Sequence, residues 1–496
     1  MALVNPSQPA NAPAHFECDY SGSSTTLHHV WEHTIGSGHA PLALRADWQA
    51  QMRRCRDELG FRYVRFHGLL CDDMGTFIIN CDKPLYSFFN IDQIFDFLVS
   101  IGMKPFVELS FMPTALASGN KTAFHYRANV TPPKDYDQWK LLIHTLATHW
   151  IARYGIEEVR SWFFEVWNEP NLDAFGSGKQ EDYFKLYQST AEAIKSVDAE
   201  LRVGGPVTAA NAWITDFVSF CKTNKLPSDF ISTHHYPTDA FGNPGDDTEA
   251  QLAASRRGVL REQALGVVQQ AEGKPVYYTE WSSSSNPRDP MHDQPYAAAF
   301  AVKTLMEVSG LVEAYSYWTF SDIFEENYFP SMPFHGGFGL MNIHGIPKPI
   351  YRAYELLRGL GTELLHIDGT HATVDIWAVS SKNSLILLIT NYALPRHPLV
   401  TENVQITINN ISEPKSATVA RIDDDHANAR RAWEELGSPD YLDHDQLEAL
   451  QSASQMGRAD QDYKYNNKTV ELIVLVPPQG IASVTLSGLK ATADAK

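Results

Sequence analysis

The sequence is poor in cysteine and in long hydrophobic runs. It has five cysteines among 496 residues and no Cys-x-x-Cys pair, so we expect free thiols in a reducing compartment rather than disulfides or a zinc site. No run approaches the roughly 20 apolar residues that cross a bilayer. The N-terminal residues have neither a basic start nor an apolar stretch of signal-peptide length. These absences predict a cytoplasmic protein that has no membrane span.

Positive charge is also scarce. There are 40 Lys and Arg against 59 Asp and Glu, which gives a formal net charge of −19. Such a surface repels DNA, RNA and anionic lipid, so we expect no nucleic acid or membrane partner. The nucleotide-binding G-x-G-x-x-G turn does not follow the first expected strand, and the H-E-x-x-H and G-x-S-x-G motifs are missing. We therefore expect no cofactor, no metal and no serine nucleophile.

Between residues 28 and 360, short apolar or aromatic runs alternate with amphipathic segments. This alternation is typical of βαβ units around a parallel sheet. Eight strands are expected, at 28–36, 61–68, 104–110, 162–170, 201–206, 230–237, 275–281 and 314–320. Segments 91–98 and 139–150 between them carry apolar stripes of helical period. Eight such units favour an α/β fold closed as a (β/α)8 TIM barrel over an open sheet.

Beyond residue 360 the pattern changes to short strands without intervening helices. The runs lie at 373–380, 384–392, 404–411, 416–422, 469–476 and 481–488. They predict an antiparallel β-sandwich, interrupted by a charged, alanine-rich helical insert near 424–455. We thus divide the chain into an N-terminal segment that packs on the sandwich, a catalytic barrel, the accessory sandwich and a frayed tail. Their bounds are 1–27, 28–360, 361–490 and 491–496.

Two of the expected barrel strands have a carboxylate residue at their carboxyl end. The fourth strand ends with Glu169, two residues after Trp167, and the seventh ends with Glu280. In a (β/α)8 barrel the active site forms at the carboxyl ends of the strands, and burying an unpaired carboxylate there is costly. Each could have a structural role, Glu169 as a helix cap and Glu280 as a partner of Arg65. Together, two such carboxyls can cleave an acetal, one as acid and one as nucleophile.

An ordered series of motifs extends over the whole expected barrel. The segments are WEHTIGSGHA (31–40), RYVRFHG (62–68), FEVWNEPNL (164–172), STHHYP (232–237), YYTEWSSSSNPRDP (277–290), YSYWTFSDIFEE (315–326) and FHGGFGLMNIHGIPKP (334–349). The series resembles glycoside hydrolase family 39 of clan A, which contains β-xylosidases and their α-L-iduronidase relatives. The W-N-E-P motif alone is only moderately specific, whereas the ordered series is highly specific. The resemblance also implies the C-terminal sandwich and its helical insert.

The resemblance implies roles for individual residues. Glu169 matches the acid/base and Glu280 the nucleophile of the family. Asn168 matches the residue that binds the sugar 2-hydroxyl, Tyr236 the donor to the nucleophile, and His234 a sugar-binding histidine.

Four more residues are implied less directly. His67 would contact the sugar and Arg65 would lie near the nucleophile, on the same face of the second strand. Trp318 would form the platform under the sugar ring. Glu325 would bind distal hydroxyls, although the adjacent Glu326 leaves the register open. Core packing is the alternative role for His67 and Trp318. His235 alternates to the opposite side of its strand and is expected to be structural.

The expected function is that of a retaining exo-glycosidase. It would remove terminal β-D-xylosyl residues from xylo-oligosaccharides by double displacement, so that its partner is a small oligosaccharide. The alternatives are an iduronidase-like or other clan A glycosidase, and a non-catalytic carbohydrate-binding barrel. An iduronidase needs cations to hold its substrate carboxylate, and the segment after Glu280 offers only Arg288 before His292. The sequence leaves the oligomeric state open.

Overall fold

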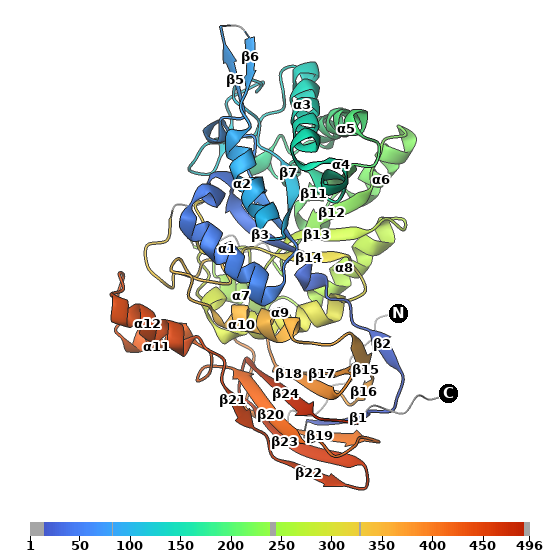
Figure 1. Cartoon of the computed structure of the whole chain (residues 1–496), viewed down its shortest axis with the longest axis vertical. Coiled ribbons are helices and arrows are strands. Elements are labelled where there is room, and N and C mark those ends of the chain that lie inside the picture. The colour runs from blue at the N-terminus through green and yellow to red at the C-terminus, as the bar shows by residue number, and fades with distance from the viewer. Residues whose placement is uncertain (1–13, 82, 239–244, 327–328, 491–496) are drawn as a thin grey trace.

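The chain folds into a barrel and a β-sandwich that lie end to end (Figure 1). The computed structural model describes residues 14–81, 83–238, 245–326 and 329–490. The first 13 residues of the expected N-terminal segment and the expected tail, 491–496, lie outside the described residues. Among the described residues, no helix combines the length and the apolar character needed to cross a membrane.

Eight parallel strands close the barrel, which confirms the predicted fold class. They are β3 (Thr34–His39), β4 (Tyr63–His67), β7 (Lys104–Leu109), β10 (Phe163–Val166), β11 (Arg202–Thr208), β12 (Phe230–His234), β13 (Val276–Trp281) and β14 (Ala314–Tyr317). β14 pairs with β3 to complete the ring. The first strand begins later than predicted, because Val30–Glu32 form a 3-10 turn. The apolar residues Val30 and Trp31, which were predicted to be part of the strand, are instead buried in this turn.

The helices between the strands form the outer layer of the barrel (Figure 1). They are α1 (Ala46–Leu59), α2 (Phe89–Ser100), α3 (Tyr136–Tyr154), α4 (Ile156–Arg160), α5 (Gln180–Val197), α6 (Ile214–Thr223), α7 (Thr248–Ala253), α8 (Val259–Gln270), α9 (Pro295–Val308) and α10 (Pro349–Arg358). Gly60 ends α1 at φ +81, a conformation that glycine adopts without strain. Two hairpins, β5 (Phe77–Asn80) with β6 (Lys83–Tyr86) and β8 (Thr122–Ala123) with β9 (Ala128–Asn129), extend from the barrel loops.

Aromatic rings fill the end of the barrel where the strands begin. Phe106, Phe163, Phe230 and Tyr277 come from four different strands and form one buried cluster. The rings of Phe106 and Phe163 stack with their centroids 4.8 Å apart. Because this end is packed with apolar rings, buried polar side chains in the barrel gather toward the carboxyl ends of the strands.

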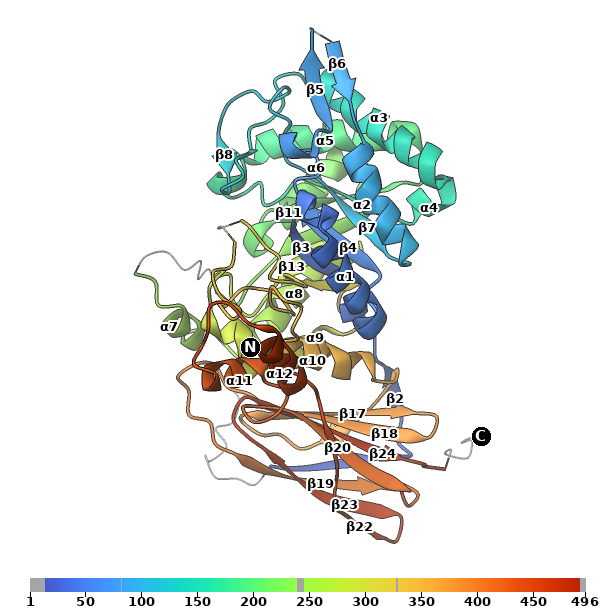
Figure 2. The same ribbon diagram turned by 60° about the vertical axis from the view of Figure 1, so that its left-hand side comes forward.

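Two sheets form the C-terminal sandwich, and Figure 2 shows them one above the other. The first contains β1 (His15–Asp19), β16 (Ile367–Asp368), β19 (Glu402–Asn409), β22 (Tyr463–Asn466) and β23 (Thr469–Val476). The second contains β2 (Ser24–Thr26), β15 (Glu363–Leu365), β17 (Val374–Ser381), β18 (Ser384–Asn391), β20 (Ser416–Ile422), β21 (Arg458–Asp460) and β24 (Gly480–Ser487). The pairing is antiparallel except between β1 and β19, which run parallel. The N-terminal strands β1 and β2 therefore each join one sheet of the sandwich.

Helix α9 and the helical insert are among the elements that attach the sandwich region to the barrel. Helix α9 is buried along nearly its whole length, because it packs against α10 on one side and against β18 and β24 on another. The insert forms α11 (Ala429–Glu435) and α12 (His444–Ala453), and its Trp433 packs on Phe334 of a barrel loop. The insert thus lies against the barrel as well as outside the sandwich.

A buried lysine joins the loops that follow the last two barrel strands. Lys348 is fully buried, and its Nζ lies 2.6 Å from Asp293 Oδ1 and 2.7 Å from Asp322 Oδ2. It also donates to the carbonyl oxygen of Gly337 at 2.8 Å. Burial disfavours the ammonium, but the two carboxylates outweigh this and raise the pKa of Lys348.

We expect Lys348→Met to lower the free energy of unfolding by about 3–5 kcal/mol, because it leaves two buried carboxylates without their cation. The matched control is Lys222→Met, since Lys222 pairs with Glu272 at the surface with 76% of its side chain exposed. Urea denaturation would measure both variants. Equal midpoints for the two variants would contradict a supporting role for Lys348.

Candidate active site

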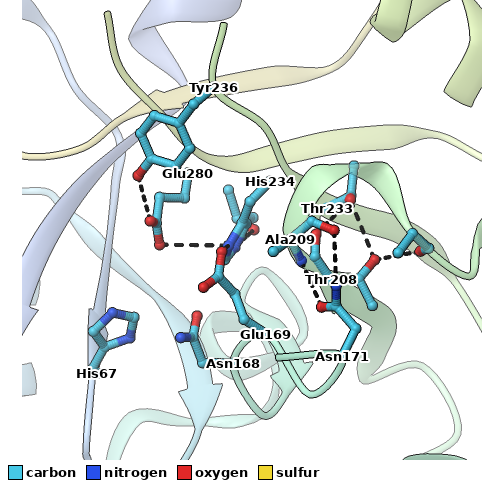
Figure 3. Close-up of polar contacts among 12 residues, drawn as sticks. His67, Asn168, Glu169, Asn171, Thr208, Ala209, Thr233, His234, Tyr236 and Glu280 are labelled. Carbon is cyan, nitrogen blue, oxygen red and sulfur yellow. Dashed lines mark hydrogen bonds and ion pairs between the residues drawn. The ribbon is translucent and has the colours of Figure 1, made fainter. Parts of the chain in front are cut away.

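The two strand-end glutamates face each other at the carboxyl end of the barrel (Figure 3). Glu169 follows β10 and Glu280 lies in β13. One carboxylate oxygen of Glu169, one of Glu280 and a ring nitrogen of His234 all lie within 4.8 Å of one another. Both glutamates line a cavity of about 640 Å³. The fold therefore brings the predicted pair into one site, although 111 positions separate them in the chain (280 − 169).

A strained turn after β10 fixes Glu169. Trp167 and Glu169 have positive φ angles of 77° and 43°, which cost energy for residues with a side chain. Hydrogen bonds hold the turn, since Glu169 N donates to Val207 O at 2.9 Å and Trp167 Nε1 donates to Phe175 O at 2.7 Å. The turn orients the Glu169 side chain toward Glu280 and away from the barrel wall.

A hydrogen-bond donor and a nearby cation favour the ionised form of Glu280. Tyr236 Oη donates to Glu280 Oε1 at 2.5 Å, and Arg65 Nη1 lies 3.6 Å from Oε2. Burial raises the pKa of Glu280 and Glu169 adds to this, whereas the charge of Arg65 lowers it. The site thus contains two close carboxyls of which one has both a phenol and a cation beside it.

Arg65 is the centre of the polar network in the barrel. It is fully buried, with Nε 2.5 Å from Glu165 Oε2 and Nη2 2.8 Å from Glu108 Oε2. Nη2 also donates to Asn168 Oδ1 at 2.9 Å, which fixes the orientation of this amide. Burial opposes its charge, but the neighbouring carboxylates raise the pKa of Arg65. Arg65 therefore remains a cation under the glutamate pair.

His67 and Trp318 lie against each other beside the site, and of the two Trp318 lines the cavity. His67 Nδ1 lies 2.7 Å from Glu108 Oε2, and its ring centroid is 4.7 Å from that of Trp318. Trp318 lines the cavity, and its ring passes directly over Gly36 of β3. A Cβ at position 36 would lie only 2.6 Å from Trp318 Cε3, so that only glycine leaves room for the ring.

The structure corrects the register of the loop after β14. Glu326, not the predicted Glu325, lines the cavity, and its Oε1 lies 3.3 Å from His67 Nε2. Glu325 instead pairs with His39 Nδ1 at 2.5 Å. Burial and the nearby carboxylates raise the pKa of Glu326 well above its usual range, which favours its protonated form. The loop has no sequence period from which this orientation could be deduced.

His234, the last residue of β12, and His235, which follows it, point in different directions, as the two-residue period of a strand predicts. His234 Nδ1 lies 3.0 Å from Glu169 Oε1, and its Nε2 lies 3.2 Å from Thr279 Oγ1. Burial lowers the pKa of His234 to about 4. The ring of His235 stacks on Tyr278 with centroids 4.0 Å apart and hydrogen-bonds to Tyr315, although it also borders the cavity.

Several residues of the site had no role predicted from the sequence. They are Glu108, Glu165, Thr279 and the aromatic wall residues Phe124, Phe175 and Phe338. Glu108 and Glu165 did carry a signal, since each is a lone acid within an apolar strand. The loop aromatics carried none.

Among the described residues, two groups of side chains have potential metal-ligand atoms that lie within 4.8 Å of one another. One is Glu169, His234 and Glu280, and the other is His39, Cys71 and Asp73. The first group is internally hydrogen-bonded, and His39 of the second is paired with both Glu325 and Asp73. Acetal cleavage by two carboxyls needs no metal, so the chemistry of the site is accounted for by these side chains.

Comparison with known proteins agrees with this geometry. The model of the family "Glycosyl hydrolases family 39" matches residues 15–465. A beta-xylosidase from Caldicellulosiruptor saccharolyticus is 51% identical over 466 residues, covering 93% of this chain and 96% of that protein. One from Geobacillus stearothermophilus is 38% identical over 443 residues, covering 85% and 86%.

A solved structure extends the likeness to three dimensions. The crystal structure of a monomeric beta-xylosidase from Caulobacter crescentus CB15 superposes with a TM-score of 0.83 at 34% identity, covering 97% of this chain and 100% of that one. The family match spans the barrel, both strand-end glutamates and the sandwich as far as β22. The chain is therefore a glycoside hydrolase that belongs to glycosyl hydrolases family 39.

Proposed function

We propose that this chain is a retaining exo-β-xylosidase that releases xylose from the ends of short xylo-oligosaccharides. The observation that carries the proposal is the approach of Glu169 and Glu280 to within 4.8 Å between carboxylate oxygens. Retaining glycosidases separate these groups by about 5–5.5 Å, whereas inverting ones leave about 6.5–9.5 Å for a water molecule. The beta-xylosidase relatives described above support the same reaction.

In the first step Glu280 attacks the anomeric carbon. Tyr236 and Arg65 hold its carboxylate ionised and in place for the attack. Glu169 protonates the departing glycosidic oxygen, and a covalent glycosyl ester forms on Glu280.

In the second step Glu169, now ionised, removes a proton from water, and the water attacks the same carbon. Glu280 is released, and the anomeric configuration is retained overall. Asn168, oriented by Arg65, is positioned to bind the 2-hydroxyl, and Trp318 supplies an apolar face for the sugar ring.

The charge of the cavity favours a neutral sugar. Among the described residues that line it are four acids, Glu169, Asp173, Glu280 and Glu326, and no Lys or Arg. A uronic acid would meet the ionised Glu280 there, with no lysine or arginine among these lining residues to balance its own charge. This supports a neutral pentose over the iduronidase-like alternative, and the intact carboxylate pair supports catalysis over simple sugar binding.

A panel of nitrophenyl glycosides tests the proposal. We expect the β-D-xyloside to be cleaved at least tenfold faster, in kcat/KM, than the β-D-glucoside and the α-L-iduronide. Proton NMR of the fresh reaction should show β-xylose before the α-anomer, and a 2-fluoro xyloside should label the peptide that contains Glu280. First-formed α-xylose would exclude the double displacement, and a preferred iduronide would exclude the assigned sugar.

Glu169→Ala tests the acid/base role. Because the proton matters most for a poor leaving group, the variant should lose roughly 10²–10⁴-fold on xylobiose but far less on an activated aryl xyloside. Azide, which needs no base, should restore turnover of the aryl xyloside and yield a glycosyl azide. Asp173→Ala removes another carboxylate from the cavity wall and should show neither effect. Equal losses on both substrates would assign the acid to another residue.

Tyr236→Phe tests the support of the nucleophile. Removing the phenol that donates to Glu280 raises the pKa of this carboxylate. A nucleophile must be ionised, so activity disappears as the pH falls through that pKa. The acidic limb of kcat/KM should therefore move to higher pH, by about one unit for one charge-assisted hydrogen bond. Tyr278→Phe, whose hydroxyl donates to Asn211 outside the pair, should leave the limb in place. A limb unmoved in Tyr236→Phe would belong to another group.

A further inference from the structure

Glu169 and Glu280 must share one proton, and catalysis requires that proton to be on one particular glutamate of the two. Two carboxyls within 4.8 Å in a buried site do not both ionise readily, so they titrate as a coupled pair. Burial and Glu169 both raise the pKa of Glu280, which by itself would favour protonation of the nucleophile. The double displacement requires the proton to be on Glu169. Some feature of the site has to decide between the two.

A chain of hydrogen bonds leads from the buried cation to Glu169. Arg65 Nε donates to Glu165 Oε2 at 2.5 Å, and Thr279 Oγ1 donates to Glu165 Oε1 at 2.8 Å. Thr279 Oγ1 lies 3.2 Å from His234 Nε2, and His234 Nδ1 lies 3.0 Å from Glu169 Oε1. Glu165, Thr279 and His234 are all fully buried, so water does not compete for these contacts.

The direction of each bond follows from counting protons. Glu165, ion-paired with Arg65, can only accept, so the single hydroxyl proton of Thr279 is used toward Glu165. The Thr279 oxygen must then accept from His234, which places a proton on Nε2. His234 is neutral above its lowered pKa of about 4, and it has no second ring proton. Its Nδ1 therefore presents a lone pair to Glu169.

The lone pair distinguishes the two glutamates. It accepts a hydrogen bond from a neutral Glu169, which keeps its proton, but it repels an ionised Glu169. Glu280 has its own hydrogen-bond donor in Tyr236 and an ion-pair partner in Arg65, whereas His234 Nδ1 lies 3.5 Å from Glu280 and 3.0 Å from Glu169. The ionisable groups that face Glu169 and His234 from the surrounding strands and loops are Arg65, Glu108, Glu165, His235, Tyr236, Glu280 and Glu326.

We propose that Thr279 is a positioning residue that fixes the tautomer of His234 and thereby places the shared proton of the pair on Glu169. The inference rests on the proposed function, because it assigns the acid and the nucleophile as above. In the second step the same lone pair makes the Glu169 carboxylate a stronger base toward water, since no donor from His234 stabilises its charge.

Thr279→Val tests the inference with little change in shape. Without the hydroxyl, His234 can carry its proton on Nδ1 and donate to an ionised Glu169, which lowers the pKa of the acid. An acid must be protonated, so the alkaline limb of kcat/KM on xylobiose should move to lower pH, by about one unit. Thr279→Ser keeps the hydroxyl and should keep the limb within a few tenths of a unit. A uniform loss of activity in Thr279→Val without a shift would reduce Thr279 to packing and overturn the inference.

A second measurement does not depend on turnover. Nitrogen NMR of the full chain with ¹⁵N-labelled histidine, assigned by comparison with His234→Gln, reports the tautomer of His234. We expect Nε2–H in the parent chain and in Thr279→Ser, and Nδ1–H in Thr279→Val. An Nδ1–H tautomer in the parent chain would overturn the inference. If the parent chain failed to cleave any β-xyloside, the proposed function would fail, and the tautomer would still decide the state of His234.

Discussion

The active site depends on one buried cation, Arg65. Its guanidinium contacts Glu165, Glu108 and Asn168 and approaches Glu280, so that side chains from three other barrel strands or their ends converge on it. A guanidinium suits this position because its planar fork gives several donors in fixed directions. Without it, three buried carboxylates would face one another in a low-dielectric interior. The aromatic cluster at the other end of the barrel excludes water from beneath this network.

The two catalytic carboxyls have different surroundings, and Arg65 lies next to one of them. Glu280 lies beside the cation and a tyrosine hydroxyl, whereas Glu169 lies beside a neutral imidazole. Close carboxyls with unlike surroundings are how glycosidases keep one as acid and the other as base or nucleophile. The strained turn at Glu169 is part of the same arrangement, because this unfavourable backbone conformation positions the Glu169 side chain.

The sandwich stabilises the barrel without entering the site. Helix α9, which directly follows the loop after β13, packs against β18 and β24, so the sandwich supports the element behind the nucleophile strand. The insert helices reach the barrel loops through Trp433 and Phe334. Lys348 connects the loops after β13 and β14 through its ion pairs with Asp293 and Asp322. The loops that frame the cavity are thus held from several sides.

The sequence by itself determined the eight strands, their helices and the change to a sandwich, because local hydrophobic period encodes secondary structure. It also indicated Glu169 and Glu280, because a carboxylate at the end of an apolar barrel strand is costly to bury unless it is paired or takes part in the chemistry. Only the tertiary structure decided that Glu326 rather than Glu325 lines the cavity, since a loop has no period. It alone joined Glu165 to Thr279 across 114 positions and gave His234 its two partners. Such contacts form between strands that meet only when the barrel closes, and no local pattern in the chain specifies which side chains then lie within hydrogen-bond distance.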